Sequence, residues 1–292
     1  MDYKSVFRKA CLLQLTISVW MGSKMLDQGI MTKVAENSDW LRGRKFLINP
    51  ELLGPLHTES HQARNLVKRY ALPFPITSLN LIPKDSLTLL DDRLKVRKER
   101  FWEKSEAFIG SYDFAREQAK GFLENLFDEA DYPLDIRSKF KFEWRFLALD
   151  LPGKGSILSP QVYEREKEKF EAMMDEARCL AGTSLREEFA QIVNHLVERL
   201  ASGQNKTLKS SMFNKLHEFL ADLTTRDIFD DAALRDLAAT ARDTISGISP
   251  YALNYDGGMR STISTAMATL KQTIDDSIED LPRRKIRLQL AA

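Results

Sequence analysis

The chain of 292 residues lacks the features of a secreted or membrane-spanning protein. It has no run of about 18 consecutive apolar residues, and no continuous apolar stretch at its N-terminus that would direct secretion. Its two cysteines, Cys11 and Cys179, lie far apart and form no metal-binding or redox motif. These absences predict a protein that spans no membrane, has no disulfide framework and stays in the reducing cytoplasm.

The sequence also lacks the residue patterns of a catalytic site. No combination of Ser, His and Asp, of Cys and His, or of paired carboxylates has a recognisable spacing. A hydrolase or nuclease would need a site assembled between subunits. We therefore predict no catalytic residues, no cofactor and no metal ion, and we predict that the chain alone is not an enzyme.

Charge is balanced over the whole chain but not along it. The chain has 43 Lys plus Arg and 42 Asp plus Glu, for a formal net charge of +1. Residues 1–100 hold 17 basic and 10 acidic side chains, residues 101–200 hold 14 and 20, and the remainder holds 12 of each. This asymmetry fits salt-sensitive contact between copies of the chain, or a partner with a charged face. A solvated surface with uneven composition explains it equally well.

Alternating residues predict three β-strands. Apolar side chains recur at every second position over residues 11–19, 139–149 and 285–290, which is the periodicity of a strand. In the second segment, Phe140 and Phe142 begin an aromatic face that must be buried. Because a short isolated strand is not stable, we predict that all three meet in one small mixed or antiparallel sheet. A strand left without a partner could instead pair with a neighbouring subunit.

Two long helices are predicted in the middle of the chain. From residue 84 to about 129 there is no proline, and apolar residues recur every seven positions from Leu87 to Phe122. The same face also carries Leu90, Tyr112, Ala119 and Leu126. The second long helix begins at Ser159-Pro160, with Ser159 as its cap, and can bend at Gly182. We predict that the two helices form a long antiparallel hairpin that carries a small β element.

Shorter helices are predicted on both sides of this hairpin. Asn49 and Pro50 begin one that runs to Tyr70. Three more, over about 206–223, 230–246 and 258–279, form a helical bundle, and Asp230 is a plausible cap for the middle one. The predicted fold class is therefore mainly α with a small β element (α+β).

The same elements suggest three regions. These are an N-terminal strand and helix region (1–83), the long helical hairpin with its central strand (84–202), and the C-terminal helices with a terminal strand (203–292). Because the strands come from all three regions, we predict one interlocked unit.

Three short motifs resemble ligand sites, but each has a simpler explanation. His57 and His61 share one helix face at the spacing of two zinc ligands, yet no third ligand is evident and a polar helix face explains them. The segment 153–156 lacks the first glycine of a phosphate-binding loop and reads as a turn. The segment 254–258, with Arg260 nearby, could bind an anion at a helix start, but is more often only a loop.

Two basic stretches are candidates for contact with nucleic acid or a partner. Phosphate binding requires lysines and arginines on one face. On a helix the first stretch spreads around the axis, and a solvated flank is favoured; the second can neutralise acidic residues just before it. The stretches consist of Arg93, Lys95, Arg97, Lys98, Arg100 and Lys104, and of Arg283, Arg284, Lys285 and Arg287.

The order of motifs over residues 10–200 resembles a known family. The motifs are Trp20-Met21-Gly22, Leu47-Ile48-Asn49-Pro50, Leu56 and His57, Arg64, Arg69 and Tyr70, and Phe140-Lys141-Phe142-Glu143-Trp144. They resemble an uncharacterised bacterial and phage family, a domain of unknown function encoded on mobile elements. The resemblance implies neighbouring genes for a MoxR-type AAA+ ATPase and a von Willebrand A-domain protein similar to the cobalt chelatase T subunit. It carries over no functional residue, because the pattern contains no catalytic signature.

Together these observations favour an interaction protein. We hypothesise a non-catalytic scaffold or adaptor that forms homo-oligomers, or docks onto the AAA+ ATPase and the von Willebrand A-domain partner in a mobile-element system. The alternative is a DNA-associated helical protein of a phage or plasmid that uses the basic stretches. The near-zero net charge argues against a dedicated nucleic-acid binder.

Overall fold

The computed structural model describes residues 6–33, 40–149, 159–201 and 208–279. It confirms the predicted fold class, because the chain is mainly α-helical with a small antiparallel β element. The chain divides into two compact units. Unit 1 comprises residues 1–12, 71–85 and 147–292, and unit 2 comprises residues 13–70 and 86–146. Each unit is therefore assembled from segments that are separated in the sequence.

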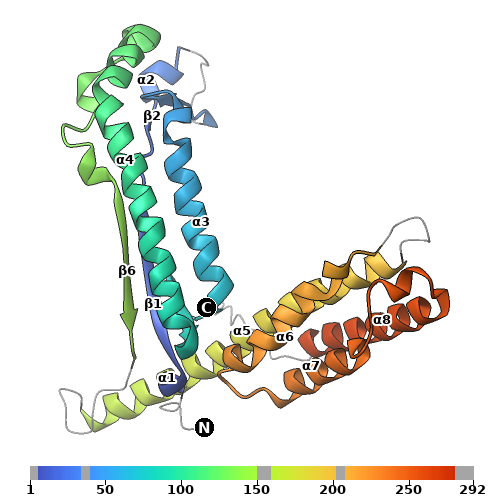
Figure 1. The fold of residues 1–292 in the computed structure, drawn as a ribbon. Coiled ribbons are helices and arrows are strands. Elements are labelled where there is room, and N and C mark those ends of the chain that lie inside the picture. The colour runs from blue at the N-terminus through green and yellow to red at the C-terminus, as the bar shows by residue number, and fades with distance from the viewer. Residues whose placement is uncertain (1–5, 34–39, 150–158, 202–207, 280–292) are drawn as a thin grey trace. The chain divides into compact units, whose positions relative to one another are not determined.

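Unit 1 is a bundle built around one long helix. Its helices are α1 (Val6–Lys9), α5 (Pro160–Ala201), α6 (Asn214–Arg226), α7 (Ala232–Ile245) and α8 (Gly257–Glu279), with 3-10 turns η8 (Ser210–Phe213) and η9 (Ala252–Asn254) (Figure 1). α8 packs along α5, and α7 packs on α8. Phe189 of α5 stacks on Phe219 of α6, with ring centroids 4.9 Å apart. The apolar faces of these amphipathic helices form one core, as their periodicity requires.

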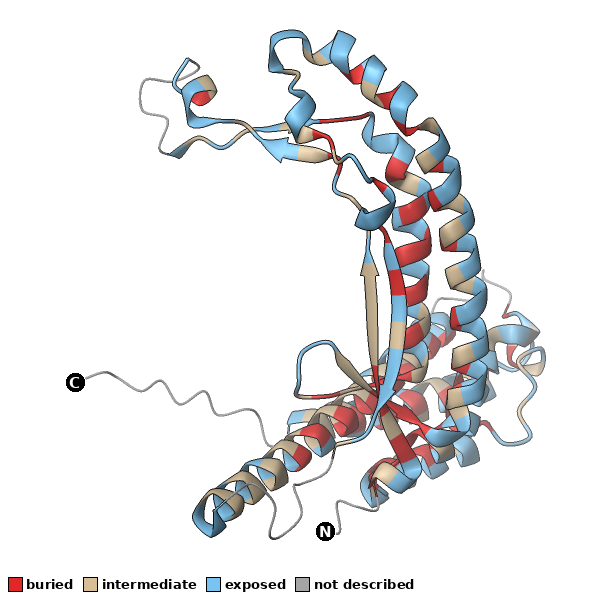
Figure 2. Cartoon of the chain, turned by 90° about the vertical axis from the view of Figure 1, so that its left-hand side faces the viewer, coloured by how far each residue is buried: buried red, intermediate tan, exposed pale blue. Residues whose placement is uncertain are grey.

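Unit 2 is built around two helices and an aromatic strand. α3 (Gly54–Tyr70) packs on α4 (Leu87–Leu123). Figure 2 shows the buried residues along one side of α4. On that side, Phe101 contacts Phe142 at 5.5 Å between ring centroids, and Phe108 contacts Phe140 at 5.7 Å. The predicted burial of the aromatic face is thereby confirmed for these two positions, but it is wrong for Phe146 near the end of the strand, which is 39% exposed.

The remaining elements of unit 2 are short. They are β2 (Ser23–Met25), α2 (Gln28–Met31), β3 (Arg44–Phe46), and the 3-10 turns η3 (Pro50–Leu53), η5 (Glu124–Leu126), η6 (Glu129–Asp131) and η7 (Arg137–Lys139), while η4 (Lys84–Ser86) leads into α4. The predicted start of the N-terminal helix is confirmed, since the Asn49 side chain accepts a hydrogen bond from the backbone N–H of Glu51 at 3.0 Å. Tyr132 lies in the segment that follows α4. It connects this segment to the one before η3, because its hydroxyl donates to the carbonyl of Leu47 at 2.8 Å.

The strands form a four-stranded sheet and a separate hairpin. The four-stranded sheet has the order β4-β5-β1-β6, and β2 pairs antiparallel with β3. The strands of the four-stranded sheet are β1 (Ala10–Ser18), β4 (Leu72–Pro73), β5 (Leu79–Pro83) and β6 (Lys141–Leu147). β1 and β6 confirm two predicted strands, and the boundary between the units falls within β1, after Leu12. The third predicted strand, 285–290, lies outside the described residues.

The two long helices, α4 and α5, pack on other helices than the prediction gave them. α4 and α5 belong to different units, and each packs on a helix of its own unit, α3 and α8 respectively. The predicted pairing of these two helices as one hairpin is thus replaced by two separate helix pairs. The physical reason is that α3 and the aromatic side chains of β6 already cover the apolar seam of α4. α5 also continues through Gly182 without a break in the helix.

The predicted seam of α4 is wrong at its C-terminal end. Phe122 is 89% exposed, and Leu126 is exposed beyond the helix. A straight α-helix drifts by about 20° per seven residues, so a strict seven-residue repeat leaves the buried side after several turns. The other predicted positions in this half of the helix, Tyr112, Ala115 and Ala119, are buried, which confirms the seam up to Ala119.

The N-cap of α7 also differs from the predicted one by a single residue. Asp231, and not Asp230, accepts a hydrogen bond from the backbone N–H of Leu234 at 3.0 Å. Asp230 has a φ of 55°, in the left-handed region, and so belongs to the preceding turn. Among the described helices, none is long and apolar enough to cross a lipid bilayer.

A candidate interaction surface

A buried carboxylate in unit 2 forms ion pairs with two residues of the first basic stretch. The side chain of Glu59 on α3 is 5% exposed. Arg97 donates to its Oε2 at 3.1 Å, and Lys104 donates to its Oε1 at 2.5 Å. Burial alone would raise the pKa of Glu59, but these two cations outweigh it and hold the pKa below its ordinary value. Both cations therefore join α4 to α3.

Three further cations of this stretch have partners within unit 2. Arg93 donates to the Tyr70 hydroxyl, and its guanidinium lies 5.4 Å from the centre of that ring. Lys95 pairs with Asp91 at 2.7 Å, and Lys98 lies 5.7 Å from the ring of Trp144. These contacts give most of the stretch a partner within unit 2, while Arg93 and Lys95 stay exposed to solvent.

The remaining residues of the two basic stretches are either exposed or lie outside the described residues. Arg100 is exposed on α4. The second stretch, Arg283, Arg284, Lys285 and Arg287, lies outside the described residues.

A second buried carboxylate of unit 2 fixes the β2–β3 hairpin. Lys24 of β2 and Lys45 of β3 are directly opposite each other in the register, which would be repulsive without an anion. The side chain of Asp131 is buried between them, pairing with Lys24 and, at 2.5 Å, with Lys45. Burial alone would raise the pKa of Asp131, but hydrogen bonds from both lysines keep it below its ordinary value. One face of the hairpin is thus clamped by charge.

The other face of the same hairpin exposes apolar side chains. Because successive side chains of a strand alternate in direction, Met25 and Phe46 point away from Asp131. Met25 is 47% exposed and Phe46 is 56% exposed. Met21, which precedes β2, is exposed beside them, and its sulfur accepts a hydrogen bond from Arg44 at 3.7 Å. We call the set Met21, Met25, Arg44 and Phe46 the hairpin face.

More large apolar side chains are exposed near this end of unit 2. The hairpin and the C-terminal end of α4 lie at the same end of the unit (Figure 1). Phe122 at the end of α4 and Leu134 in the following segment are exposed, as is Trp40 before β3. A single exposed apolar residue is ordinary, whereas several in one region mark interaction surfaces. Neither the hairpin nor this region was predicted, because strands of three residues show no measurable alternation.

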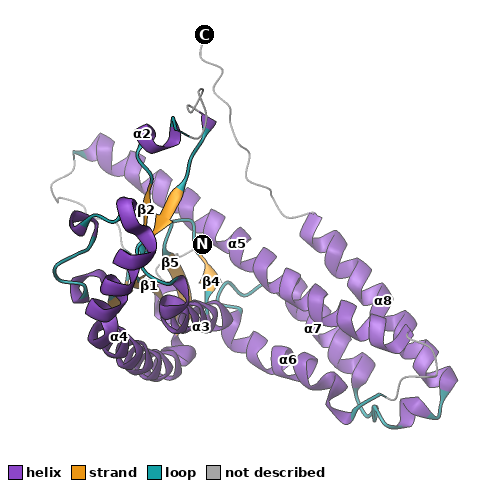
Figure 3. Ribbon diagram, turned by 90° about the horizontal axis from the view of Figure 1, so that it is seen from above, coloured by secondary structure: helices purple, strands orange, loops and turns teal. Residues whose placement is uncertain are grey.

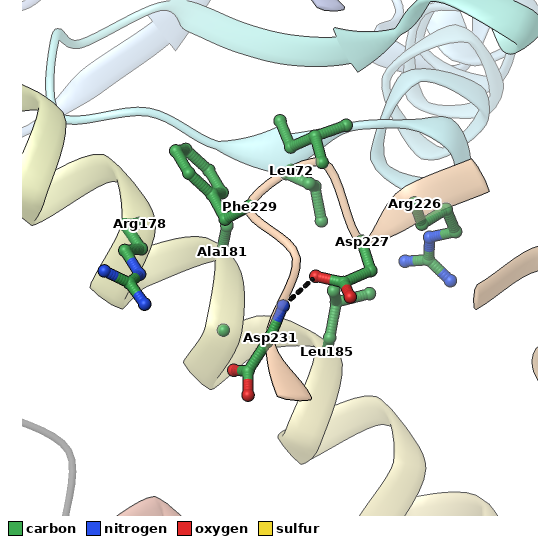
Figure 4. Close-up of a pocket in the computed structure, with 10 residues that line it drawn as sticks. Leu72, Arg178, Ala181, Leu185, Arg226, Asp227, Phe229 and Asp231 are labelled. Carbon is green, nitrogen blue, oxygen red and sulfur yellow. Dashed lines mark hydrogen bonds between the residues drawn. The ribbon is translucent and has the colours of Figure 1, made fainter. Parts of the chain in front are cut away.

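Unit 1 contains a small hollow lined by charged and apolar side chains. It lies where the segment between α6 and α7 meets α5, and its lining includes Leu72, Leu185 and Asp227 (Figure 4). Asp227 Oδ1 accepts from the backbone N–H of Asp231 at 2.8 Å. Burial raises the pKa of Asp227, because the charged form loses its hydration there. Arg186 donates to both oxygens of Asp231, at 2.6 and 3.0 Å.

This hollow serves the structure of the bundle. Arg186 joins α5 to the start of α7, and Arg226 at the end of α6 makes a two-pronged contact with Glu188 of α5, at 3.0 and 2.6 Å. Both guanidinium groups are therefore occupied by carboxylates of the same unit. The arrangement positions the segment between α6 and α7 against α5.

The other motifs have structural roles or no assembled partners. His57 and His61 are exposed on α3, and no cluster of His, Cys, Asp and Glu suited to a metal occurs in the described part of the chain. Arg260 donates to the carbonyl of Leu200 at 2.8 Å, at the end of α5. Asp256 caps α8 by accepting from the backbone N–H of Met259 at 2.8 Å. Residues 153–156 lie outside the described residues.

The fold and these surfaces define a class of protein. It is a mainly helical protein of two discontinuous units, with charge-clamped elements and an exposed apolar hairpin face.

A family model places the chain more specifically. The model described as "Protein of unknown function (DUF3150)" matches residues 7–224, so the chain belongs to this family. The predicted resemblance to a family of unknown function is thereby confirmed. The comparisons found no match among curated proteins and none among solved structures.

Proposed function

We propose that this protein is a non-catalytic scaffold or adaptor that binds a protein partner through the hairpin face. The observation that supports the proposal is the contrast between the two sides of the β2–β3 hairpin. Two lysines and a buried aspartate hold one side, so the exposed Met25 and Phe46 on the other are presented from a fixed base. Exposed Met and aromatic side chains are typical of protein-binding surfaces.

The partners proposed by resemblance are a MoxR-type AAA+ ATPase and a von Willebrand A-domain protein of a mobile element. Self-association is proposed as well, with contact between basic and acidic regions of different copies. Part of that charge is already paired within unit 2, where Lys24 and Lys45 of the basic first third meet Asp131 of the acidic middle. Salt should therefore weaken any self-association only in proportion to the charges that remain exposed.

The test is direct binding of the purified chain to these two proteins. We expect the double variant Met25→Asp and Phe46→Asp to reduce affinity by about tenfold or more, because it places charge in an apolar contact. Leu89→Asp is the matched control, since Leu89 of α4 is 46% exposed and lies in the same unit. Equal loss in both variants, or binding by neither protein to the wild type, would contradict the proposal. Light scattering on the same samples tests self-association.

The nucleic-acid alternative has less support from the contacts. Five of the six cations of the first stretch contact groups within unit 2, so phosphates would have to compete with these contacts. The alternative stays a prediction. Its test is a gel-shift experiment, which should show binding to nucleic acid at low salt and a steep loss of binding as the salt concentration rises.

A further inference from the structure

The C-terminal third of α4 carries an uncharged, accessible face. α3 lies beside α4 (Figure 3), and this face belongs to the part of α4 that is not buried. Phe114 is 69% exposed and Phe122 is 89% exposed. We give the name α4 outer face to six neighbouring positions, none of which is charged or buried: Gly110, Ser111, Phe114, Gln118, Gly121 and Phe122.

The six positions share one side of the helix. Successive residues of an α-helix are about 100° apart around its axis, so the six fall within an arc of about 120°. The buried residues Tyr112, Ala115 and Ala119 are centred about 110° away from the middle of that arc. The α4 outer face therefore lies beside the core-facing side of α4 and takes no part in the core of unit 2.

The two glycines of this face are not required by the packing of the chain itself. A Cβ atom added to Gly110 or Gly121 would meet nothing within 4 Å outside its own stretch of helix, among the described residues, and neither glycine has a positive φ. Glycine is a poor helix former, so both weaken α4 without an internal benefit. Glycine is useful where another backbone or a large side chain approaches closely. Beside two exposed phenylalanines, these glycines indicate contact with another helix.

The order of large and small residues fits a second copy of the same face. In an antiparallel pair of α4 helices with a two-fold axis at the level of residue 116, positions equally far before and after 116 lie opposite each other. The opposite pairs are Gly110 with Phe122, Ser111 with Gly121, and Phe114 with Gln118. The largest exposed side chain of each copy thus lies over a glycine of the other, and every contact occurs twice.

The size of this contact predicts a weak dimer. A covered aromatic side chain buries about 150–250 Å². Given their exposure, Phe114 and Phe122 of two copies together bury about 500–800 Å². Stable complexes bury about 1,200–2,000 Å², so we expect a dissociation constant of roughly tens of micromolar.

We propose that the protein forms an antiparallel homodimer through the α4 outer face. The contact is apolar, and Glu117 at its edge lies near the two-fold axis, so that the Glu117 side chains of the two copies repel each other slightly. The α4 outer face shares no residue with the hairpin face. The dimer therefore presents the hairpin face twice, which strengthens binding to a partner that has two or more sites.

The first test is sedimentation velocity of the full chain from about 5 to 500 μM, a range that brackets the expected dissociation constant. We expect monomer at the low end and dimer at the high end. The double variant Phe114→Gln and Phe122→Gln should weaken dimerisation about tenfold or more, because it removes the apolar centre of the contact. The matched control is Val96→Gln, since Val96 is 46% exposed on the same helix outside the face. A wild type that stays monomeric, or equal weakening in variant and control, would overturn the proposal.

The variant Gly110→Gln separates the contact from the stability of the fold. Gln is a better helix former than Gly, so the variant should unfold at a temperature a few degrees higher. Its side chain occupies the space into which Phe122 of the second copy packs, so the dissociation constant should rise about fivefold or more. Glu117→Gln should lower that constant about twofold, because it removes a repulsion. If Gly110→Gln dimerised as well as the wild type, the proposed contact would be wrong.

Cross-linking tests the direction of the two helices. Cys11 and Cys179, the free cysteines, are replaced by Ala, and a single cysteine is introduced by Glu117→Cys or by Glu103→Cys. In the antiparallel pair the two positions 117 are about 3 Å apart along the axis, and the two positions 103 are about 39 Å apart. A short bismaleimide should therefore link only the Glu117→Cys protein into dimers. Links at both positions indicate a parallel pair and links at neither indicate no contact, and each result contradicts the proposal.

Salt distinguishes this dimer from self-association through opposite charges. Apolar contacts are not screened, so added salt should leave the dissociation constant unchanged or slightly lower. A dimer that dissociates as salt rises would argue for the charged contact and against the α4 outer face. Binding of a partner to the hairpin face is not part of these measurements, so the two proposals can fail separately.

Discussion

The two units use different interactions to hold their helices together. In unit 1, helices from residues 160 to 279 share one large apolar core, in which Phe189 and Phe219 stack. In unit 2, fewer helices meet, and buried carboxylates complement the aromatic contacts. Glu59 joins α3 to α4, and Asp131 joins the hairpin to the segment after α4. A unit with fewer helices to share a core thus relies more on charge.

The units also differ in the ion pairs that join their helices. In the two pairs that join α5 to the neighbouring elements of unit 1 the buried partner is arginine, since Arg186 and Arg226 are 4% and 10% exposed while their carboxylates are more accessible. In unit 2 the buried partner is the acid, which is 5% exposed for Glu59 and 0% for Asp131. A buried acid between two cations loses both contacts when it is protonated, so unit 2 should be the more acid-sensitive of the two.

The largest expected effect comes from truncating the apolar core of unit 1. Phe189 is fully buried, and Phe189→Ala should lower the free energy of unfolding by about 4 kcal/mol, since it leaves a cavity. Hydrogen exchange read by mass spectrometry should show the loss of protection in unit 1. Phe101→Ala is the counterpart in unit 2. If either variant loosened both units equally, the comparison of two separate units would fail.

A smaller effect is expected from the buried carboxylate between α3 and α4. Glu59→Gln should destabilise unit 2 by about 1–2 kcal/mol, a value reduced because Arg97 and Lys104 keep partial access to solvent. The pKa of Glu59 is lowered in the folded state, so its contribution is present above the ordinary value of about 4.5 and is lost as pH falls through the lowered value.

Denaturant titrations of wild type and Glu59→Gln between pH 3 and 7 would measure this contribution. The difference between the two proteins should shrink as the pH falls. Glu103→Gln, which changes an exposed acid on α4, is the control and should have no measurable effect. A difference that is independent of pH would mean that Glu59 acts through packing and not through its charge.

A local effect is expected at the hairpin. Asp131→Asn leaves Lys24 and Lys45 opposite each other without an anion, and should cost about 1 kcal/mol because Lys24 is half-exposed. Amide exchange should speed up in residues 23–25 and 44–46 and stay unchanged in α3. The hairpin face would then be presented from a looser base, so partner binding should weaken too. Unchanged exchange in the hairpin would show that the clamp is dispensable.

The smallest effect is expected at Asp227 in unit 1, and it has the opposite sign. Its pKa is raised by burial, so the folded state binds the proton more tightly than the unfolded state. Its contribution to stability is therefore largest below the ordinary value of 3.8 and falls as pH rises through the raised value. Asp227→Asn should be neutral or stabilising by up to about 1 kcal/mol at pH 7, because it removes a buried charge. Thermal unfolding of unit 1 at pH 4 and pH 7 checks this, and clear destabilisation at pH 7 would contradict it.

Local signals in the sequence were sufficient for helix starts and long strands. Asn49 before Pro50 and Ser159 before Pro160 mark helix starts through side-chain chemistry that acts within a few residues. The strand from Ala10 to Ser18 is long enough to show its alternation. Such features depend on neighbours in the sequence and so can be predicted from it.

The partners of the helices and the candidate surface could not be predicted in this way. Whether α4 packs on α3 or on α5 depends on which apolar faces meet in space, and each helix carries a suitable face. Asp131 pairs with both Lys24 and Lys45, and it lies more than a hundred positions after Lys24 in the sequence. The charges that suggested contact between copies were therefore partly used inside one unit.

The discontinuity of the two units has a consequence for synthesis on the ribosome. Every segment of unit 2 has been made once residue 146 is added, whereas unit 1 still lacks all of its long helices. At about 5–20 residues per second, roughly ten seconds or more of synthesis separate the two events. During that interval the helices that complete the core of unit 1 are absent. Apolar side chains of its early segments are then unburied, among them Val6, Leu12, Leu72 and Leu81. The new chain therefore carries exposed apolar segments of unit 1 through the middle of its translation, which is the stage at which aggregation competes with folding.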